Sequence, residues 1–258
     1  MNTQHATAMI DLNADVGEGS PADAALIPLV SSVNIACGAH AGDDATMART
    51  VALAAAHDCA IGAHPGYADP EHFGRRALDL PAPAIHRLVA EQIEALARHA
   101  HAAGTRLSHV KPHGALYNQA AREMDLAMAI ARAVHEVDPN LALVGLAGSA
   151  LLTAGRRLAL RVAAEAFVDR RYEADGSLTP RGHPDALIED PEDAVQQVLA
   201  ILRTGRLMTR TGQMVALTAD TFCVHGDSPA ALVLVQTLRE RLAADGIAVQ
   251  PLTTPSTH

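Results

Sequence analysis

The stretch MIDLNADVGEG, residues 9–19, joins an apolar strand pattern to three polar side chains and a turn that contains two glycines. Because side chains alternate along an extended strand, Asp11, Asn13 and Asp15 share one face of it. Acid and amide groups that point into a core are costly unless they are paired or functional. The stretch therefore predicts a buried strand whose polar face serves a site at its C-terminal end.

The rest of the chain repeats this arrangement of short apolar runs and longer helical patterns. Further strands are predicted at residues 32–37, 60–64, 106–111, 141–147, 161–167 and 221–226. Helices are predicted near residues 45–57, 83–103, 121–137, 149–157, 191–204 and 228–244, with Asp190 as the N-cap of the fifth. Such alternation indicates βαβ units and a parallel sheet. Residues 170–190 are predicted to form a loop over the sheet. We expect one domain over residues 1–258, with short flexible termini at about 1–8 and 252–258.

Polar residues decide between a closed barrel and an open, doubly wound sheet. They occur at the C-terminal end of nearly every predicted strand: Asp11, Asn13 and Asp15; Asn34 and His40; His64; Lys111 and His113; Glu165 and Asp169; His225 and Asp227. In a barrel these strand ends share one face, whereas in an open sheet only the strands at the switch point contribute. The pattern favours a distorted, TIM-like (β/α) barrel with about seven parallel strands.

Composition excludes several classes of function. The net charge is −9 and no basic run is present, which argues against nucleic-acid binding. No apolar run reaches the roughly 18 residues that span a bilayer. The N-terminus lacks the pattern of a signal peptide, and the three scattered cysteines form no CxxC. We expect a cytoplasmic protein without a nucleic-acid or membrane partner, and a homo-oligomer remains possible.

The segment HVKPHGALYN, residues 109–118, contains the only lysine of the chain, whereas the other basic residues are arginines. Lys111 has three possible roles: holding an anionic substrate or transition state, forming a Schiff base, or pairing with Asp15 or Glu165. A solvent-exposed lysine would have drifted to arginine in so arginine-rich a chain. Lys111 is therefore expected to act as an ammonium in a confined place.

Three other glycine-rich or basic motifs add candidate site residues. NIACGAHAGD, residues 34–43, contributes His40 and also Cys37, for which a buried thiol is a commoner state than a nucleophile. GAHPGY, residues 62–67, places a histidine before a turn that faces a cleft. The two arginines of FGRR, residues 73–76, suit a carboxylate, although a solvated surface pair explains them equally well.

Together with FVDRRY and CVHGD, these motifs resemble the LamB/YcsF family from about Ile10 to Ile247. The resemblance implies a barrel of the glycoside hydrolase/deacetylase type. It also implies an ATP-dependent 5-oxoprolinase, which cleaves 5-oxo-L-proline to L-glutamate together with partner subunits B and C. ATP is then a co-substrate, and Mg²⁺ is expected to accompany it. A P-loop is excluded because the chain has no GxxxxGK[ST] motif.

Roles follow for the residues at the strand ends. The expected catalytic set is Asp15, Glu165 or His64 as the base for water, Lys111 and Arg170 for developing negative charge, and His113 or His225 as proton donor, with His40 in the same pocket. The expected substrate-binding set is Asn13, Asn34, Tyr117, Arg75, Arg76 and Asp227.

Two alternatives remain open. The strand-end motifs are also similar to those of divalent-metal-dependent deacetylases that act on N-acetylated carbohydrates or other amides, with Asp15, His64 and His113 as metal ligands. Val16 argues against this, since it occupies the place where those enzymes usually carry a metal-binding aspartate. The other alternative is a catalytically silent binding module, which the intact set of charged strand-end residues disfavours.

Overall fold

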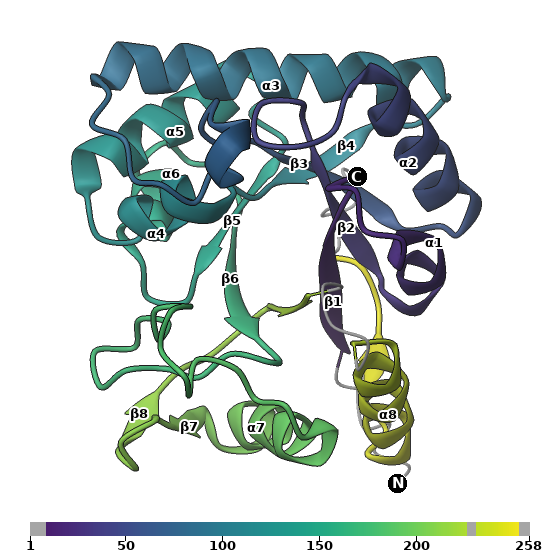
Figure 1. Ribbon diagram of the computed structural model, residues 1–258, viewed down its shortest axis with the longest axis vertical. Coiled ribbons are helices and arrows are strands. Elements are labelled where there is room, and N and C mark those ends of the chain that lie inside the picture. The colour runs from purple at the N-terminus through teal and green to yellow at the C-terminus, as the bar shows by residue number, and fades with distance from the viewer. Residues whose placement is uncertain (1–8, 226–230, 253–258) are drawn as a thin grey trace, which may run out of the picture.

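The computed structural model describes residues 9–225 and 231–252, and its central feature is a closed barrel of seven parallel strands (Figure 1). Six strands follow one another around the barrel: β1 (Met9–Val16), β2 (Ser32–Ala36), β3 (Ala60–His64), β4 (Leu107–Val110), β5 (Ala142–Leu146) and β6 (Val162–Phe167). The seventh, β9 (Thr221–Val224), pairs with both β6 and β1 and so closes the ring. The predicted TIM-like barrel of about seven parallel strands is confirmed. It is irregular, because the register shifts between β3 and β4 at Ile61 and Gly62.

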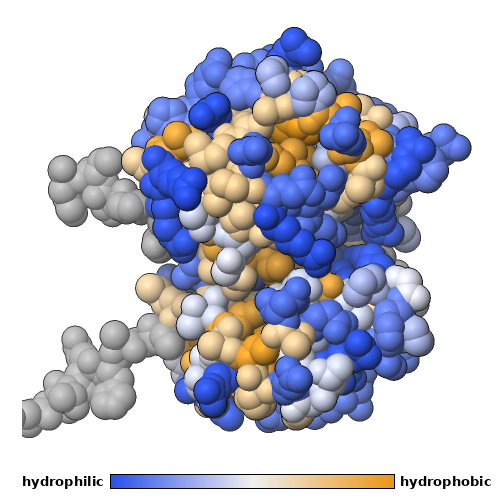
Figure 2. All heavy atoms as spheres, turned by 90° about the vertical axis from the view of Figure 1, so that its left-hand side faces the viewer, coloured by the Kyte–Doolittle hydropathy of each residue, from blue (hydrophilic) through white to orange (hydrophobic). Residues whose placement is uncertain are grey.

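Helices surround the barrel as the βαβ pattern predicts. The long ones are α2 (Asp44–Ala56), α3 (Ala82–Ala102), α5 (Met124–Val137), α6 (Ala150–Arg157), α7 (Pro191–Thr204) and α8 (Ala231–Ala244). The predicted cap of α7 is present, since the Asp190 side chain accepts a hydrogen bond from the backbone N–H of Glu192 at 2.8 Å. Hydrophilic side chains surround hydrophobic patches on the face shown in Figure 2. No helix among the described residues is long and apolar enough to cross a membrane.

Several short elements were not predicted. The helix predicted near residues 121–137 is present as α5, which starts at Met124, and a further helix before it, α4 (Gly114–Ala120), was not predicted. The strands β7 (Arg206–Met208) and β8 (Met214–Ala216) form an antiparallel hairpin outside the barrel. The short helices α1 (Asp23–Leu26), η1 (Ile27–Leu29) and η2 (Pro70–His72), and the strand β10 (Ala248–Val249) beside β1, were also missed. Elements of two to four residues are too short to show a hydrophobic period.

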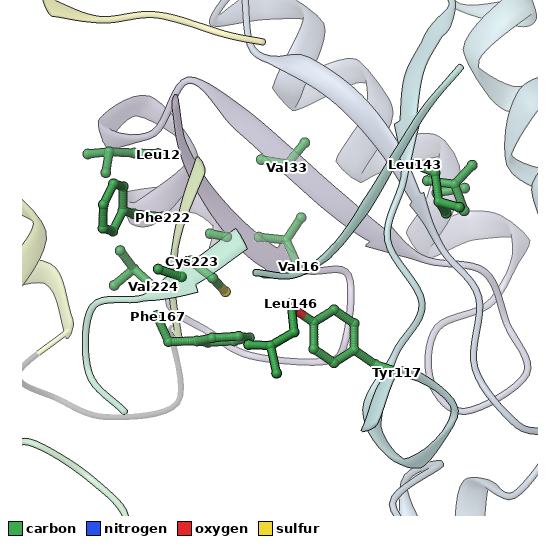
Figure 3. Close-up of a cluster of buried hydrophobic side chains, with 14 of the residues drawn as sticks. Leu12, Val16, Val33, Tyr117, Leu143, Leu146, Phe167, Phe222, Cys223 and Val224 are labelled. Carbon is green, nitrogen blue, oxygen red and sulfur yellow. The ribbon is translucent and has the colours of Figure 1, made fainter. Parts of the chain in front are cut away.

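The apolar faces of the strands point outward to the helices. On β1, Leu12, Ala14 and Val16 are completely buried there. Leu12 pairs in register with Phe222 on β9, and the two side chains lie side by side in Figure 3. These residues belong to the core that packs barrel against helices.

The inner faces are polar, in contrast to the branched aliphatic filling usual in such barrels. At one end the Asp11 carboxylate accepts hydrogen bonds from the hydroxyl groups of Ser31, Ser32 and Thr221. Burial raises the pKa of Asp11, against the effect of these hydrogen bonds. Three hydroxyl donors thus replace the water that this carboxyl group loses on folding.

The next layer is a chain of amides and one imidazole. Asn34 donates to Asn13 Oδ1 at 2.8 Å and accepts from His109 Nε2 at 2.8 Å, while Asn13 donates to Glu165 Oε1 at 3.0 Å. Burial, aided by the charge of Lys111, lowers the pKa of His109 to about 3, so its ring is neutral. The ring fits because Gly62 faces it: a Cβ on Gly62 would lie 2.1 Å from His109 Nε2.

Gly62→Ala should therefore displace the His109 ring and break its hydrogen bond to Asn34. We expect the free energy of unfolding to fall by about 1–3 kcal/mol, the usual cost of overpacking a core. Urea unfolding measures the change. Gly182→Ala is the matched control, because a Cβ there meets no atom within 4 Å. Equal stability of the two variants would contradict the proposed packing of this layer.

Candidate active site

A pocket of about 810 Å³ opens at the C-terminal ends of the barrel strands. Its lining includes eight of the predicted site residues: Asp15, His64, Arg75, Lys111, His113, Tyr117, Arg170 and His225. Four others, Asn13, Asn34, His40 and Glu165, are buried next to these residues and contact them or their neighbours. The structure thus brings together most of the residues that the strand-end argument selected.

Two predicted residues are not brought into the pocket. Arg76 is absent from the lining; its side chain is exposed, and its Nε lies 3.2 Å from Asp69 Oδ2. Of the two arginines of FGRR, only Arg75, which follows the left-handed turn at Phe73 and Gly74, lies in the pocket lining, and substrate binding by Arg76 stays a prediction. Asp227 lies outside the described residues.

Lys111 is the central charge of the site. Its Nζ lies 2.8 Å from Glu165 Oε1 and 3.0 Å from Asp15 Oδ1, and the side chain is almost fully buried. Burial lowers the pKa of Lys111, but the nearby carboxylates, Asp15 foremost, outweigh it and raise the pKa well above its usual value. The geometry thus supports the predicted ion pair, with both candidate partners at once. It opposes a Schiff base, which needs a neutral amine.

Glu165 is held from three sides and has no exposed surface. Its Oε1 accepts hydrogen bonds from Asn13 and Lys111, and its Oε2 accepts one from the Tyr117 hydroxyl at 2.6 Å. Burial, and then the charge of Glu165, raise the pKa of Tyr117 well above its usual value. Tyr117 lines the pocket, yet its hydroxyl proton is directed to Glu165.

Two histidines are fixed by backbone carbonyl groups. His64 Nδ1 lies 2.7 Å from the Lys111 carbonyl oxygen, and His113 Nε2 lies 2.9 Å from that of Phe73. A carbonyl only accepts, so each of these nitrogens carries a proton. The other nitrogens, His64 Nε2 and His113 Nδ1, face each other at 3.0 Å. In two neutral rings these would be two lone pairs, so a proton or another cation must lie between them.

Glu18 supplies the negative charge at this point and was missed as a site residue. Its Oε1 lies 3.1 Å from both His113 Nδ1 and His40 Nε2. Burial raises the pKa of Glu18, but the hydrogen bonds from His113 and His40 lower it far more, so the group is ionised. The sequence analysis selected Asp15 from this segment and did not select Glu18. The available signal was its position between Gly17 and Gly19, both at positive φ, where the chain turns back over the barrel.

These side chains form a group that can hold a metal ion. The ligand atoms of Glu18, His40, His64 and His113 all lie within 4.8 Å of one another. Imidazole and carboxylate are the ligands of zinc and similar ions. Of the predicted metal set, His64 and His113 belong to this group, whereas Asp15 is bonded to Lys111 and Asn34. Asp15 also belongs to a second group, with Cys223 and His225.

The pocket also contains an acid–histidine pair. His225 Nδ1 lies 2.9 and 3.0 Å from the two carboxylate oxygens of Asp169. The His225 ring stacks on the ring of Phe167, with the two ring centroids 5.5 Å apart. Burial raises the pKa of Asp169, but His225 lowers it by more. The pair fixes the His225 ring and leaves Nε2 for exchange of a proton. Cys37, by contrast, is buried outside the pocket lining, and burial raises its pKa to about 12, which argues against a nucleophile.

Comparisons with known proteins place this site in a family context. The family model described as LamB/YcsF family matches residues 10–257. The A subunit of a 5-oxoprolinase from Bordetella pertussis (strain Tohama I) is 52% identical over 246 residues, which cover 93% of this chain and 98% of that relative. The crystal structure of a lactam utilization protein from Thermus thermophilus superposes with a TM-score of 0.88 at 42% identity, covering 95% of this chain and 100% of that one. A T48 deacetylase structure shares the fold, with a TM-score of 0.50 at 15% identity over 94% of this chain and 87% of that one.

Lys111→Met removes the cation between two buried carboxylates. We expect the free energy of unfolding to fall by about 3–5 kcal/mol at pH 8, because Asp15 and Glu165 are left facing each other. In the native protein burial raises the pKa of Asp15, but the charges of His64 and Lys111 outweigh burial and hold the pKa well below its usual value. Without Lys111 the carboxyl groups favour the protonated form, so lowering the pH restores stability and the loss shrinks towards pH 5.

Denaturant titrations at pH 5 and pH 8 measure this difference. A double variant, Lys111→Met with Glu165→Gln, removes one of the opposed charges and should recover part of the loss at pH 8. A loss that is independent of pH, with no recovery in the double variant, would show that the ammonium does not neutralise these acids.

Proposed function

The chain belongs to the LamB/YcsF family, and on this premise we propose that it is the A subunit of an ATP-dependent 5-oxoprolinase. The enzyme would open 5-oxo-L-proline to L-glutamate, with hydrolysis of ATP to ADP and phosphate, together with subunits B and C. The observation that carries the proposal is the buried ammonium of Lys111 at the floor of a pocket lined by imidazoles and carboxylates. This arrangement suits proton transfer and stabilisation of an oxyanion.

The chemistry explains why ATP is needed. An unstrained lactam opens slowly at neutral pH, so the lactam oxygen first takes the γ-phosphoryl group and ADP leaves. Water then adds to the activated carbon, the C–N bond breaks with a proton going to nitrogen, and phosphate is released. The products are glutamate, ADP and phosphate, which balances the reaction.

Each residue is assigned to a step of the reaction by the atoms that its other hydrogen bonds leave available. His64 has its Nδ1 proton on a carbonyl and lines the pocket. Its Nε2 can take the proton of water when the proton on His113 Nδ1 is directed to Glu18 Oε1, 3.1 Å away, instead of to His64. His225, fixed by Asp169, is placed to return a proton to the leaving nitrogen. Lys111 stabilises negative charge on the lactam oxygen. Glu165 is fully buried with both oxygens bonded, so it acts by holding Lys111 rather than as the base.

The chain is expected to depend on partners because it lacks its own motif for a triphosphate. The sequence carries no P-loop, and its net charge of −9 opposes a polyanion. The pocket lining supplies groups for proton transfer, while the nucleotide site must be borrowed or completed at an interface between subunits.

The purified chain alone should neither hydrolyse ATP nor open 5-oxoproline at a useful rate, and it should do both after subunits B and C are added. A coupled assay of ADP and glutamate release, with each subunit omitted in turn, measures this. ATP-coupled glutamate formation by this chain alone would refute the partner dependence. Glutamate formation by the full set without ATP would refute the activated-lactam mechanism.

A second candidate function is a divalent-metal-dependent deacetylase acting on an N-acetylated carbohydrate or other amide. It is favoured by the group of Glu18, His40, His64 and His113, in which three imidazole nitrogens and an ionised carboxylate converge. A metal ion held there would polarise an amide carbonyl and activate water. Without a metal, these side chains satisfy one another's hydrogen bonds when one of the facing rings is protonated on both nitrogens. The 5-oxoprolinase proposal assumes this state.

Metal analysis separates these two functions. Under the first proposal, protein purified without a His-tag should hold less than one equivalent of metal after dialysis against a chelator. Its 5-oxoprolinase activity with subunits B and C should then return on adding Mg²⁺ with ATP. A stoichiometric ion that is retained by the wild type and lost in Glu18→Gln, together with deacetylation of an N-acetylated sugar, would favour the deacetylase instead.

A further inference from the structure

Arg170 is a buried cation whose donors are only partly used. It follows β6 in the loop over the barrel, it lines the pocket, and only 6% of its surface is exposed. Its Nη2 donates to the Thr179 carbonyl oxygen at 2.6 Å, while its Nε is completely buried and has no hydrogen-bond partner in the described structure. A buried, unsatisfied donor on a charged group is costly, so the described residues leave this guanidinium incompletely satisfied, and an anion in the pocket that Arg170 lines can supply the missing charge.

The acid next to Arg170 offsets its charge only in part, since the pKa of Arg170 remains below its usual value. The neighbouring acid, Asp169, directs both carboxylate oxygens to His225. After burial, the largest influence on Arg170 is a second cation, Arg181, which also lines the pocket, and together they lower the pKa of Arg170. An anion bound beside Arg170 would offset the repulsion that Arg181 exerts on it.

The main chain holds Arg170 in this position. Arg170 forms an isolated bridge with Leu187, and its carbonyl oxygen accepts a hydrogen bond from Gln197 at 3.0 Å. The guanidinium is therefore a fixed donor and not a flexible surface group. A planar, preorganised guanidinium suits a carboxylate.

A series of neighbouring residues connects Arg170 to Lys111. Arg170 follows Asp169 in the chain, Asp169 binds His225, and His225 stacks on Phe167, whose ring centroid lies 5.3 Å from Lys111 Nζ. Arg170 and Lys111 line the same pocket, so a ligand with an anionic group and a carbonyl oxygen meets both kinds of cation there.

We propose that Arg170 and Arg181 form a subsite for the carboxylate group of the substrate and so orient its lactam carbonyl towards Lys111. This inference rests on the proposed function and assigns the two ends of 5-oxo-L-proline to two walls of the pocket. The carboxylate does not change charge during ring opening. Its subsite therefore binds the ground state and the transition state equally well. Loss of the subsite should raise KM and leave kcat unchanged.

The test uses the assembled enzyme with subunits B and C and measures kcat and KM for 5-oxo-L-proline and for ATP. Arg170→Gln should raise KM for 5-oxoproline about 10- to 100-fold, with kcat and KM for ATP within about twofold of the wild type. The KM of Arg170→Lys for 5-oxoproline should lie between those of the wild type and Arg170→Gln, because lysine keeps the positive charge but lacks the planar guanidinium. Arg171→Gln is the matched control: it makes the same change one residue along, outside the pocket lining.

The exposed side chain of Arg181 provides a variant that is expected to fold even if Arg170→Gln does not. Arg181→Gln should raise KM for 5-oxoproline and reduce the preference of the site for 5-oxoproline over its neutral carboxamide, measured as an inhibitor.

Each other outcome overturns the subsite. A rise in KM for ATP instead would assign these arginines to phosphate. A fall in kcat alone would assign them to a step of the reaction, and equal effects on the acid and its carboxamide would show a merely structural role. If the wild-type complex does not act on 5-oxoproline at all, the proposed function fails and the subsite fails with it.

Discussion

The ammonium of Lys111 is the interaction on which the interior of this barrel depends. It lies at the end of β4 and bonds to Asp15 from β1 and Glu165 from β6, so one charge ties three strands together at their C-terminal ends. Removing two carboxylates from water without a cation would cost several kcal/mol, by the usual penalty for buried ions. The polar filling of the barrel is possible because this cation and the hydrogen bonds around Asp11, Asn13 and Asn34 satisfy it.

This polar filling also made the fold predictable. In most barrels the strands are nearly continuous apolar runs, so the inward face cannot be distinguished from the outward face in the sequence. Here Asp11, Asn13 and Asp15 mark one face of β1, and the same signal recurs on the later strands. The sequence could not reveal the hairpin of β7 and β8 or the short helix α4, because these depend on tertiary packing and on turns that no period marks.

The candidate site was predictable in its members but not in its pairings. Strand ends that share a face selected Asp15, His64, Lys111 and His225 together. The role of Glu18 depends on the turn at Gly17, which brings a residue beyond the strand back over three histidines. The difference between Arg75 and Arg76 depends on the left-handed backbone at Phe73 and Gly74, which local sequence does not specify.

The burial of the only lysine has a consequence for how the protein reacts with reagents from outside. In the folded chain no lysine amine is presented to solvent, since Lys111 is protonated and enclosed by two acids. Acylating labels, amine cross-linkers and enzymes that modify lysine find no lysine target on the native surface. An amine reagent that does react with Lys111 reports that the ion pairs with Asp15 and Glu165 have been lost, so this one residue serves as a built-in probe of the barrel interior.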